Sequence, residues 1–163
     1  MDIREILHIK TGGHWLVTPS TDKTIFCREM FSEEHNDIKK MIFQFSEDRI
    51  FPNVQNIEKL DEDLCRSIMR EMGELGLIGI DTPEEFGGTD LDKITACLIT
   101  EGVGWGGSSS FGCIFGVQTG IGSLGIVFFG TPEQKKKYLP KLITGEWIAA
   151  YGLTEPSAGS DAL

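Results

Sequence analysis

Apolar residues recur at the three- and four-residue spacing of helices through most of the chain, and the pattern predicts five helices. The first begins at Ser32, whose hydroxyl suits a helix N-cap, and is kinked or interrupted at Pro52. The second begins near Asp61 and ends at Gly76, a typical stop residue. The inward positions of these two helices are Ile38, Met41, Ile42, Phe45, Ile50, Leu64, Ile68, Met72 and Leu75.

Three more helices are predicted after a glycine-containing connection. The third places Leu91, Ile94, Leu98 and Ile99 inward. The fourth spans residues 109–129, carries no charge and stops at Gly130. Residues 131–134 (TPEQ) then predict a capped helix start, because Thr can cap, Pro suits the first turn and Gln can complete a capping box. This fifth helix is expected to end near Gly145.

After residue 145 the pattern changes to that of a buried strand over residues 147–153, followed by a turn at Pro156. We therefore expect an all-α chain, an antiparallel helical bundle, with one short C-terminal strand. The expected parts are an extended N-terminal arm at 1–30, a helical domain at 31–145, and the opening of a further domain at 146–163.

Charge and cysteine usage narrow the function classes. The formal net charge is −10, and residues 58–101 hold twelve acidic against four basic residues. Such a surface repels phosphate backbones, so we expect no nucleic-acid partner. The four cysteines contain no CxxC pair, which predicts reduced thiols and a cytoplasmic protein. No histidine has a ligand-type partner at helical spacing, so no metal site is expected.

The stretch 102–132 lacks charge and is long enough to span a bilayer, with Gly112, Gly116 and Gly120 forming a double GxxxG pattern. Gln118, Thr119 and Ser123 interrupt its middle. The alternative is a helix buried on all sides in a soluble bundle, where the glycines let neighbouring backbones come close. We favour this alternative and expect the fourth helix to be the most buried one.

A second glycine pattern, Gly102, Gly104 and Gly107, satisfies GxGxxG. A dinucleotide-binding fold would place an acidic residue about 20 positions later, but the first acid after Gly102 is Glu133. A flexible loop between helices is therefore the favoured interpretation.

The segment that ends the chain has the composition of a ligand-binding loop. A strand would deliver residues 151–154 to a sheet edge, and Pro156 would turn the chain. The next residues, Ser157, Ala158 and Gly159, are small enough for backbone amides to approach a ligand. The residues alone predict either such a loop or an ordinary strand-to-turn connection.

The chain resembles the acyl-CoA dehydrogenases, most clearly at the junction of their helical and β domains, in residues 133–162 (EQKKKYLPKLITGEWIAAYGLTEPSAGSDA). The core of this match is LTEPSAGSD, residues 153–161, the family's flavin-loop signature. Its very-long-chain-like bacterial branch is resembled by residues 74–92 (ELGLIGIDTPEEFGGTDLD), by 118–134 (QTGIGSLGIVFFGTPEQ) and by a Gly-Gly-x-x-Leu arm at 12–16. The resemblance implies an N-terminal helical domain followed by the start of a truncated middle β domain.

The resemblance also implies chemistry: FAD-dependent oxidation of acyl-CoA to trans-2-enoyl-CoA, by α-proton abstraction and β-hydride transfer to flavin N5. Tyr151, Leu153 and Thr154 would contact the isoalloxazine, and Ser160 would reach the flavin pyrophosphate and the pantetheine arm of the acyl-CoA substrate. The catalytic base would lie beyond residue 163. No catalytic residue is therefore expected in this chain, which alone would be inactive.

The implied partners of the intact enzyme are acyl-CoA, an electron-transfer flavoprotein as electron acceptor, and further copies of itself, with no membrane span. Two alternatives stay open on the sequence. One is an acyl-CoA oxidase or flavin monooxygenase of the same fold. The other is a catalytically silent helical binding module.

Overall fold

The computed structural model describes residues 27–161, and the chain's contacts divide it after Asn36, so the parts on either side are taken separately. Residues 27–36 hold the 3-10 helix η2 (Arg28–Met30) and the first turn of α2. There Ser32 Oγ accepts a hydrogen bond of 3.1 Å from the His35 backbone N–H, which confirms the predicted N-cap. The predicted arm at 1–30 lies almost entirely outside the described residues.

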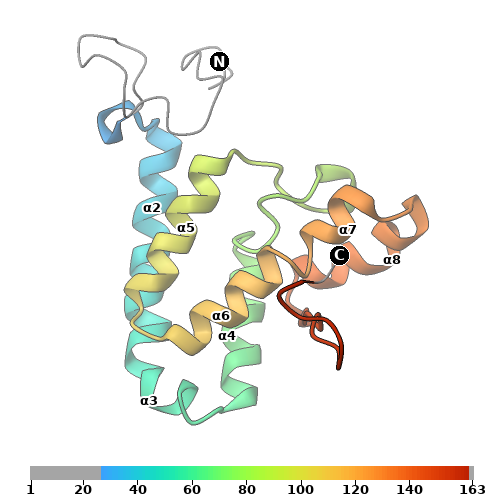
Figure 1. Cartoon of the computed structure of the whole chain (residues 1–163). Coiled ribbons are helices and arrows are strands. Elements are labelled where there is room, and N and C mark those ends of the chain that lie inside the picture. The colour runs from blue at the N-terminus through green and yellow to red at the C-terminus, as the bar shows by residue number, and fades with distance from the viewer. Residues whose placement is uncertain (1–26, 162–163) are drawn as a thin grey trace, which may run out of the picture. The chain divides into compact units, whose positions relative to one another are not determined.

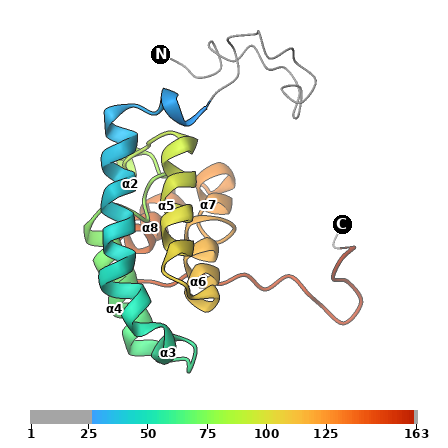
Figure 2. The same ribbon diagram turned by 90° about the vertical axis from the view of Figure 1, so that its left-hand side faces the viewer.

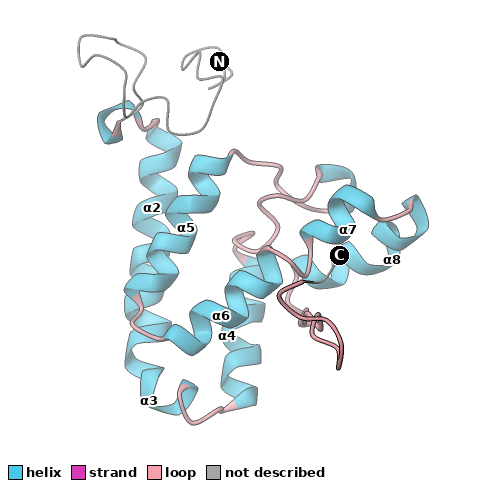
Figure 3. Cartoon of the chain, in the orientation of Figure 1, coloured by secondary structure: helices cyan, strands magenta, loops and turns pink. Residues whose placement is uncertain are grey.

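The chain from residue 37 onward is built from helices joined by loops (Figures 1 and 3). Its elements are α2 (Glu33–Phe45), the π-helix η3 (Ser46–Ile50), the 3-10 helix η4 (Phe51–Asn53), α3 (Val54–Ile57), α4 (Glu62–Glu74), the 3-10 helix η5 (Glu84–Phe86), α5 (Lys93–Trp105), α6 (Ser109–Thr119), α7 (Leu124–Phe129) and α8 (Pro132–Ile143). The long helices α2, α4, α5 and α6 alternate in direction along the chain, and α2 and α5 lie side by side in both views (Figures 1 and 2). The expected all-α antiparallel bundle is confirmed.

Capping geometry confirms the helix starts predicted at Asp61 and Thr131, and it places the start of α5 at Asp92, after the predicted helical position Leu91. Asp61 accepts from the Leu64 N–H at 3.1 Å, which caps α4, and Asp92 caps α5 through the Thr95 N–H at 2.9 Å. At α8, Thr131 carries both bonds of the capping box with Gln134. Short polar side chains thus satisfy N–H groups that have no partner within the helix.

The first predicted helix changes its hydrogen-bonding pattern around Pro52, in agreement with the predicted kink or interruption. After α2 the backbone hydrogen bonds widen in η3 and tighten in η4, where Pro52 occupies the first turn, and α3 follows directly. A proline is accommodated at the start of a helical turn because its missing N–H is not needed there. The predicted interruption is therefore a change of helical pitch.

The loop prediction for the GxGxxG glycines is wrong for Gly102 and Gly104, which lie inside α5, whereas Gly107 (φ +77°) lies in the connection to α6. A Cβ on Gly102 would meet the Ile42 side chain at 2.6 Å, and a Cβ on Gly106 would meet that of Ile50 at the same distance. These two glycines let α5 approach α2 and η3 closely. The loop interpretation failed since a helical glycine that packs against a neighbour has the same sequence pattern as a loop glycine.

The predicted fourth helix is broken. A turn at residues 120–123 separates α6 from α7, and Gly120 leaves helical geometry with φ −100° and ψ −111°. Within the described residues, Ser109–Phe129 is the one stretch with the length and apolar composition to cross a membrane. Of the 18 consecutive residues that are most apolar in it, 28% are buried. The expectation that this is the most buried helix is wrong: α6 buries Phe111, Phe115 and Gln118, whereas α5 buries Thr95, Leu98, Ile99, Gly102 and Val103.

The predicted close approach of neighbouring backbones at the double GxxxG is also wrong for all three of its glycines. A Cβ on Gly112 or on Gly116 would meet nothing within 4 Å, and a Cβ on Gly120 would meet the Gly116 carbonyl of its own helix. No neighbour lies close to Gly112 and Gly116, whereas Phe111 and Phe115, on an adjacent face of α6, are buried in the core.

The predicted strand at 147–153 is not formed. The described residues contain no sheet, and the segment after α8 is drawn as loop apart from one isolated bridge between Glu155 and Ala158 (Figure 3). A strand needs a hydrogen-bonded neighbour, and none of the described segments offers one.

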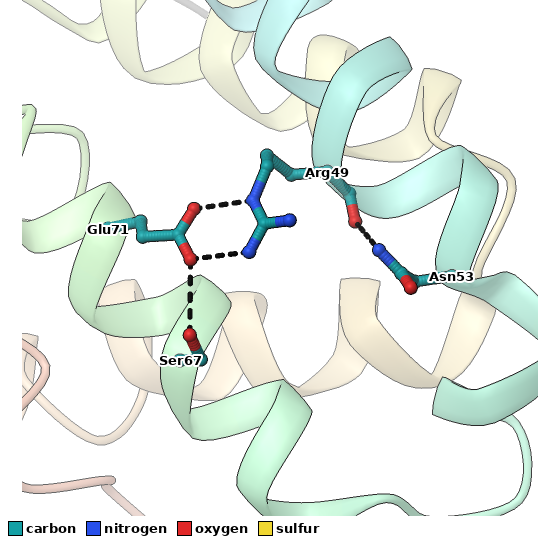
Figure 4. Close-up of polar contacts among 4 residues, drawn as sticks. All are labelled: Arg49, Asn53, Ser67 and Glu71. Atoms are coloured by element: carbon teal, nitrogen blue, oxygen red, sulfur yellow. Dashed lines mark hydrogen bonds and ion pairs between the residues drawn. The ribbon is translucent and has the colours of Figure 1, made fainter.

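A bidentate ion pair joins α4 to η3. Arg49 donates from Nε and Nη2 to the two carboxylate oxygens of Glu71, each at 2.6 Å, and Ser67 Oγ donates to the same carboxylate at 3.1 Å (Figure 4). These hydrogen bonds, that from Arg49 above all, lower the pKa of Glu71. The π-helical turn thereby holds Arg49 against a helix that is distant in sequence.

The helical glycines give a matched pair of substitutions. Gly102→Ala is expected to destabilise the chain by about 1 to 3 kcal/mol, because its Cβ must displace the β-branched Ile42. Gly116→Ala is expected to stabilise it by about 0.5 to 1 kcal/mol, because alanine is the better helix former and the site is open. Urea unfolding followed by circular dichroism measures both, and equal destabilisation by the two changes would contradict the packing described.

Removing the Glu71 charge should weaken the α4–η3 contact. Glu71→Gln is expected to cost about 1 kcal/mol, since the pair is bidentate yet about one third exposed. Because the folded state lowers the pKa of Glu71, its contribution is complete above the unfolded-state pKa and is lost as the pH falls through the folded-state pKa. The free energies of unfolding of wild type and Glu71→Gln should therefore become equal as the pH falls through this range, and urea unfolding at several pH values measures both. Glu62→Gln, at the exposed Glu62–Arg66 pair, is the control and should change little.

Candidate functional site

The segment that carries all four predicted site residues, 146–161, leaves the helices after α8 and extends away from them (Figure 2). Gly145 makes the exit with φ +68°, and a Cβ there would lie 2.7 Å from the Met69 carbonyl oxygen of α4. The Trp147 N–H then donates to the Lys141 carbonyl at 3.0 Å, and the Trp147 ring lies 6.0 Å from that of Tyr138. The first residues of the segment are therefore held against α8.

Gln118 of α6 is the second anchor of the segment. Its side chain is fully buried and uses both ends of the amide. Nε2 donates to the carbonyl of Leu142 at 2.7 Å and to that of Trp147 at 2.9 Å, and Oε1 accepts from the Ala149 N–H at 2.7 Å. One side chain thus satisfies backbone groups on both sides of the exit from α8.

Packing supplements these bonds. A Cβ on Gly122, in the turn after α6, would lie 2.4 Å from the Ala149 Cβ, so the two backbones are as close as a glycine allows. Ile148 packs against the core and lines a largely apolar hollow of about 320 Å³. The other lining residues are Ile57, Leu60, Glu62, Cys65, Arg66, Met69, Ser110 and Ile114.

Beyond Ala149 the segment is free of the helices. Tyr151, Leu153, Thr154 and Ser160 are all exposed. A four-residue turn follows, in which the Glu155 and Ala158 backbones exchange hydrogen bonds of 2.7 and 3.2 Å. The turn brings Gly159 to Thr154, whose Cγ2 lies 3.6 Å from where a glycine Cβ would be. Thr154 therefore lies next to Gly159, the residue that precedes Ser160.

The exposed loop offers hydroxyl donors, small residues and two large side chains, Tyr151 and Leu153, that are about half exposed. This set suits a flat, polar-edged ring or a phosphate better than a metal ion. Among residues 27–161 no group of three or more His, Cys, Asp or Glu is placed to hold a metal. All four cysteines lie in this range and are free thiols.

Sequence reasoning missed Gln118 as a site residue and treated it only as an interruption of an apolar stretch. It is the one amide side chain in residues 102–132. A polar group in such surroundings costs free energy unless it finds partners, and that was the available signal. The partners lie 24 to 31 residues further along the chain, so the sequence could not identify them.

Glu58, which precedes α4, holds the start of α6. Its carboxylate accepts from Ser108 Oγ and from Ser110 Oγ, each at 2.6 Å. These hydrogen bonds, that from Ser108 first, lower the pKa of Glu58. Ser108 in turn caps α6 by accepting from the Phe111 N–H at 3.1 Å. The carboxylate therefore fixes the helix that supplies Gln118.

The described residues thus define the class of this chain as an all-α helical domain with an anchored segment and an exposed, hydroxyl-bearing loop after its last helix. The chain belongs to a known family, since the acyl-CoA dehydrogenase N-terminal domain matches residues 32–146. A probable acyl-CoA dehydrogenase of Bacillus subtilis (strain 168) is 46% identical over 155 residues, which are 95% of this chain and 26% of that protein.

Two solved structures agree with this membership. The crystal structure of an acyl-CoA dehydrogenase complexed with FAD from Bacillus anthracis matches with a TM-score of 0.84 and 47% identity, over 93% of this chain and 26% of that one. A chain from a structure described as an electron transferring flavoprotein of Acidaminococcus fermentans matches with a TM-score of 0.68 and 34% identity, over 81% and 34%. The chain spans about a quarter of the length of the Bacillus relatives.

Neutralising Glu58 should loosen the start of α6. In Glu58→Gln the serine hydroxyls lose a charged acceptor, so the amides of Ser110 and Phe111 are expected to exchange with solvent faster. In wild type the stabilisation is complete above the unfolded-state pKa of Glu58 and disappears as the pH falls through its lowered folded-state pKa. Hydrogen exchange by NMR gives the readout. Glu74→Gln, at an exposed carboxylate at the far end of α4, is the control.

Proposed function

We propose that this chain is the N-terminal portion of an FAD-dependent acyl-CoA dehydrogenase, which oxidises acyl-CoA to trans-2-enoyl-CoA. The observation that carries the proposal is the loop with the sequence LTEPSAGSD, residues 153–161, exposed at the end of the helices and anchored by Trp147 and Gln118. The similarity to an acyl-CoA dehydrogenase complexed with FAD supports it.

The residues present fit FAD. Tyr151 and Leu153 expose about half of their surface and can lie against a flat ring. The Glu155 and Ala158 amides are used within the turn, which leaves the exposed hydroxyls of Thr154 and Ser160 for a ligand. When bound, FAD would supply the hydride acceptor. In this proposal Tyr151, Leu153 and Thr154 hold the isoalloxazine, with Thr154 donating at its pyrimidine edge, and Ser160 donates to the pyrophosphate and to the pantetheine of the substrate.

These residues bind and orient; they do not supply the catalytic base. Glu155 and Asp161 of the loop are exposed, and an exposed carboxylate lacks the desolvation that tunes a general base. We assign the α-proton abstraction to a carboxylate in the part of the enzyme that the relatives possess and this chain does not cover. The helical portion contributes positioning of cofactor and substrate relative to that group.

The proposed substrate is an acyl-CoA, and the open face of α6 at Gly112 and Gly116 leaves room beside the helix for an acyl chain. The proposed electron acceptor is an electron-transfer flavoprotein, which the similarity to the Acidaminococcus flavoprotein supports. We further propose that the intact enzyme is a cytoplasmic homo-oligomer. The four free thiols support a reducing compartment.

The proposal predicts different behaviour for this chain and for the longer protein, by which we mean the full-length enzyme of which this chain is proposed to be the N-terminal portion. The 163-residue chain is expected not to retain FAD through gel filtration, because its loop is exposed and ordering it would consume binding free energy. The longer protein is expected to purify with FAD and to lose its flavin absorbance when an acyl-CoA is added anaerobically. A longer protein that purifies with FAD but is not bleached by any acyl-CoA would contradict the dehydrogenase proposal.

A substitution tests the loop within the longer protein. Thr154→Ala is expected to weaken FAD binding by up to about tenfold, the effect of one lost hydrogen bond. Thr100→Ala, at an exposed threonine of α5 that bonds its own helix, is the control and should leave FAD binding unchanged.

A further inference from the structure

Gln118 differs from the other buried polar side chains of the chain by what it bonds. Its three partners, the Leu142 and Trp147 carbonyls and the Ala149 N–H, all belong to the end of α8 and the segment that follows. All three distances are between 2.7 and 2.9 Å, and the side chain is completely buried. An amide with three short bonds in one place holds the backbone on which they converge.

The hydrogen bond from the Ala149 N–H to Gln118 is the last one between the helices and this segment among the described residues. Tyr151 follows Ala149 two residues later. Gly122 approaches the Ala149 Cβ, so the segment is held by packing at the same residue. The direction in which residues 150–161 leave the domain is thus set at Ala149.

The geometry points to Gln118 as a positioning residue for the cofactor loop: its amide fixes where the segment leaves the helical domain and hence where Tyr151, Leu153 and Thr154 lie. The inference rests on the proposed function, since it assumes that these residues meet FAD. Gln118 itself touches neither cofactor nor substrate in this assignment. It acts through Trp147 and Ala149.

Two substitutions of Gln118 distinguish a role in hydrogen bonding from a role in packing alone. Gln118→Met keeps the length and approximate volume of the side chain and removes all three hydrogen bonds. Gln118→Glu keeps an acceptor for the Ala149 N–H but removes both N–H donors, and protonation of the buried carboxyl restores one of them. The second variant therefore carries its own pH-dependent rescue. Gln44→Met is the matched control, because Gln44 is exposed and bonds Asp48 one turn along the same helical run.

The experiment uses the longer protein with bound FAD. Hydrogen exchange of the Ala149 amide and of residues 150–153 reports on the anchor, and the visible circular dichroism and dissociation constant of the flavin report on the loop. In Gln118→Met we expect these amides to exchange at least about tenfold faster, those of α4 and α5 to be unchanged, and FAD to bind about tenfold or more weakly with an altered flavin spectrum. In Gln118→Glu, exchange corrected for its intrinsic pH dependence should slow as the pH falls.

Two outcomes would overturn the inference. Unchanged exchange at Ala149 would show that the amide is not the anchor. Faster exchange with unchanged flavin spectrum and affinity would show that the anchor is structural only. If Gln118→Met does not fold, Gln118→Glu decides by whether low pH restores both protection and flavin binding. A wild-type protein that binds no FAD would refute the proposed function itself, whereas a flavin-loaded wild type with an unaffected variant refutes only the role of Gln118.

Discussion

The structure depends on the rule that a buried polar group must find partners. Gln118 lies in an uncharged helix that has no other amide side chain, and its desolvation would be costly if it stayed unpaired. After α7 and α8 the chain passes α6 again, and there the amide hydrogen-bonds the Leu142 and Trp147 carbonyls and the Ala149 N–H. These bonds hold residues 147–149 against α6 and the end of α8. A polar residue that looked like a defect in an apolar helix is the point at which the helical domain holds its loop.

Close helix packing supplies the rigidity behind this anchor. Gly102 and Gly106 bring α5 against Ile42 and Ile50, so the helix before α6 is fixed to the start of the bundle. Glu58 then fixes the beginning of α6 through Ser108 and Ser110. A side chain such as Gln118 can position a loop only if its own helix does not move, and these contacts restrain α6 at its N-terminal end.

The described residues contain both a buried core and a set of exposed apolar side chains. The described helices bury their core around α4 and α5, whereas the open face of α6, the exposed Phe128 and Phe129 of α7 and the loop residues Tyr151 and Leu153 remain uncovered. Apolar groups in such number on one chain mark a surface made to be covered. This agrees with a chain that spans about a quarter of the length of the two Bacillus relatives described above.

The sequence by itself determined what depends on neighbours a few residues apart. The starts of α4 and α8 follow from Asp61 and Thr131, and the all-α class follows from helical spacing, because caps and amphipathic stripes are local. The family was also within reach of the sequence, because its resemblance rests on contiguous segments, and the family match confirms it. Tertiary structure decided the rest. Which glycines pack, Gly102 or Gly116, depends on the helix opposite; the strand at 147–153 needs a partner strand; and the partners of Gln118 lie far along the chain. Each of these is a contact between distant segments, and no local pattern encodes a contact of that kind.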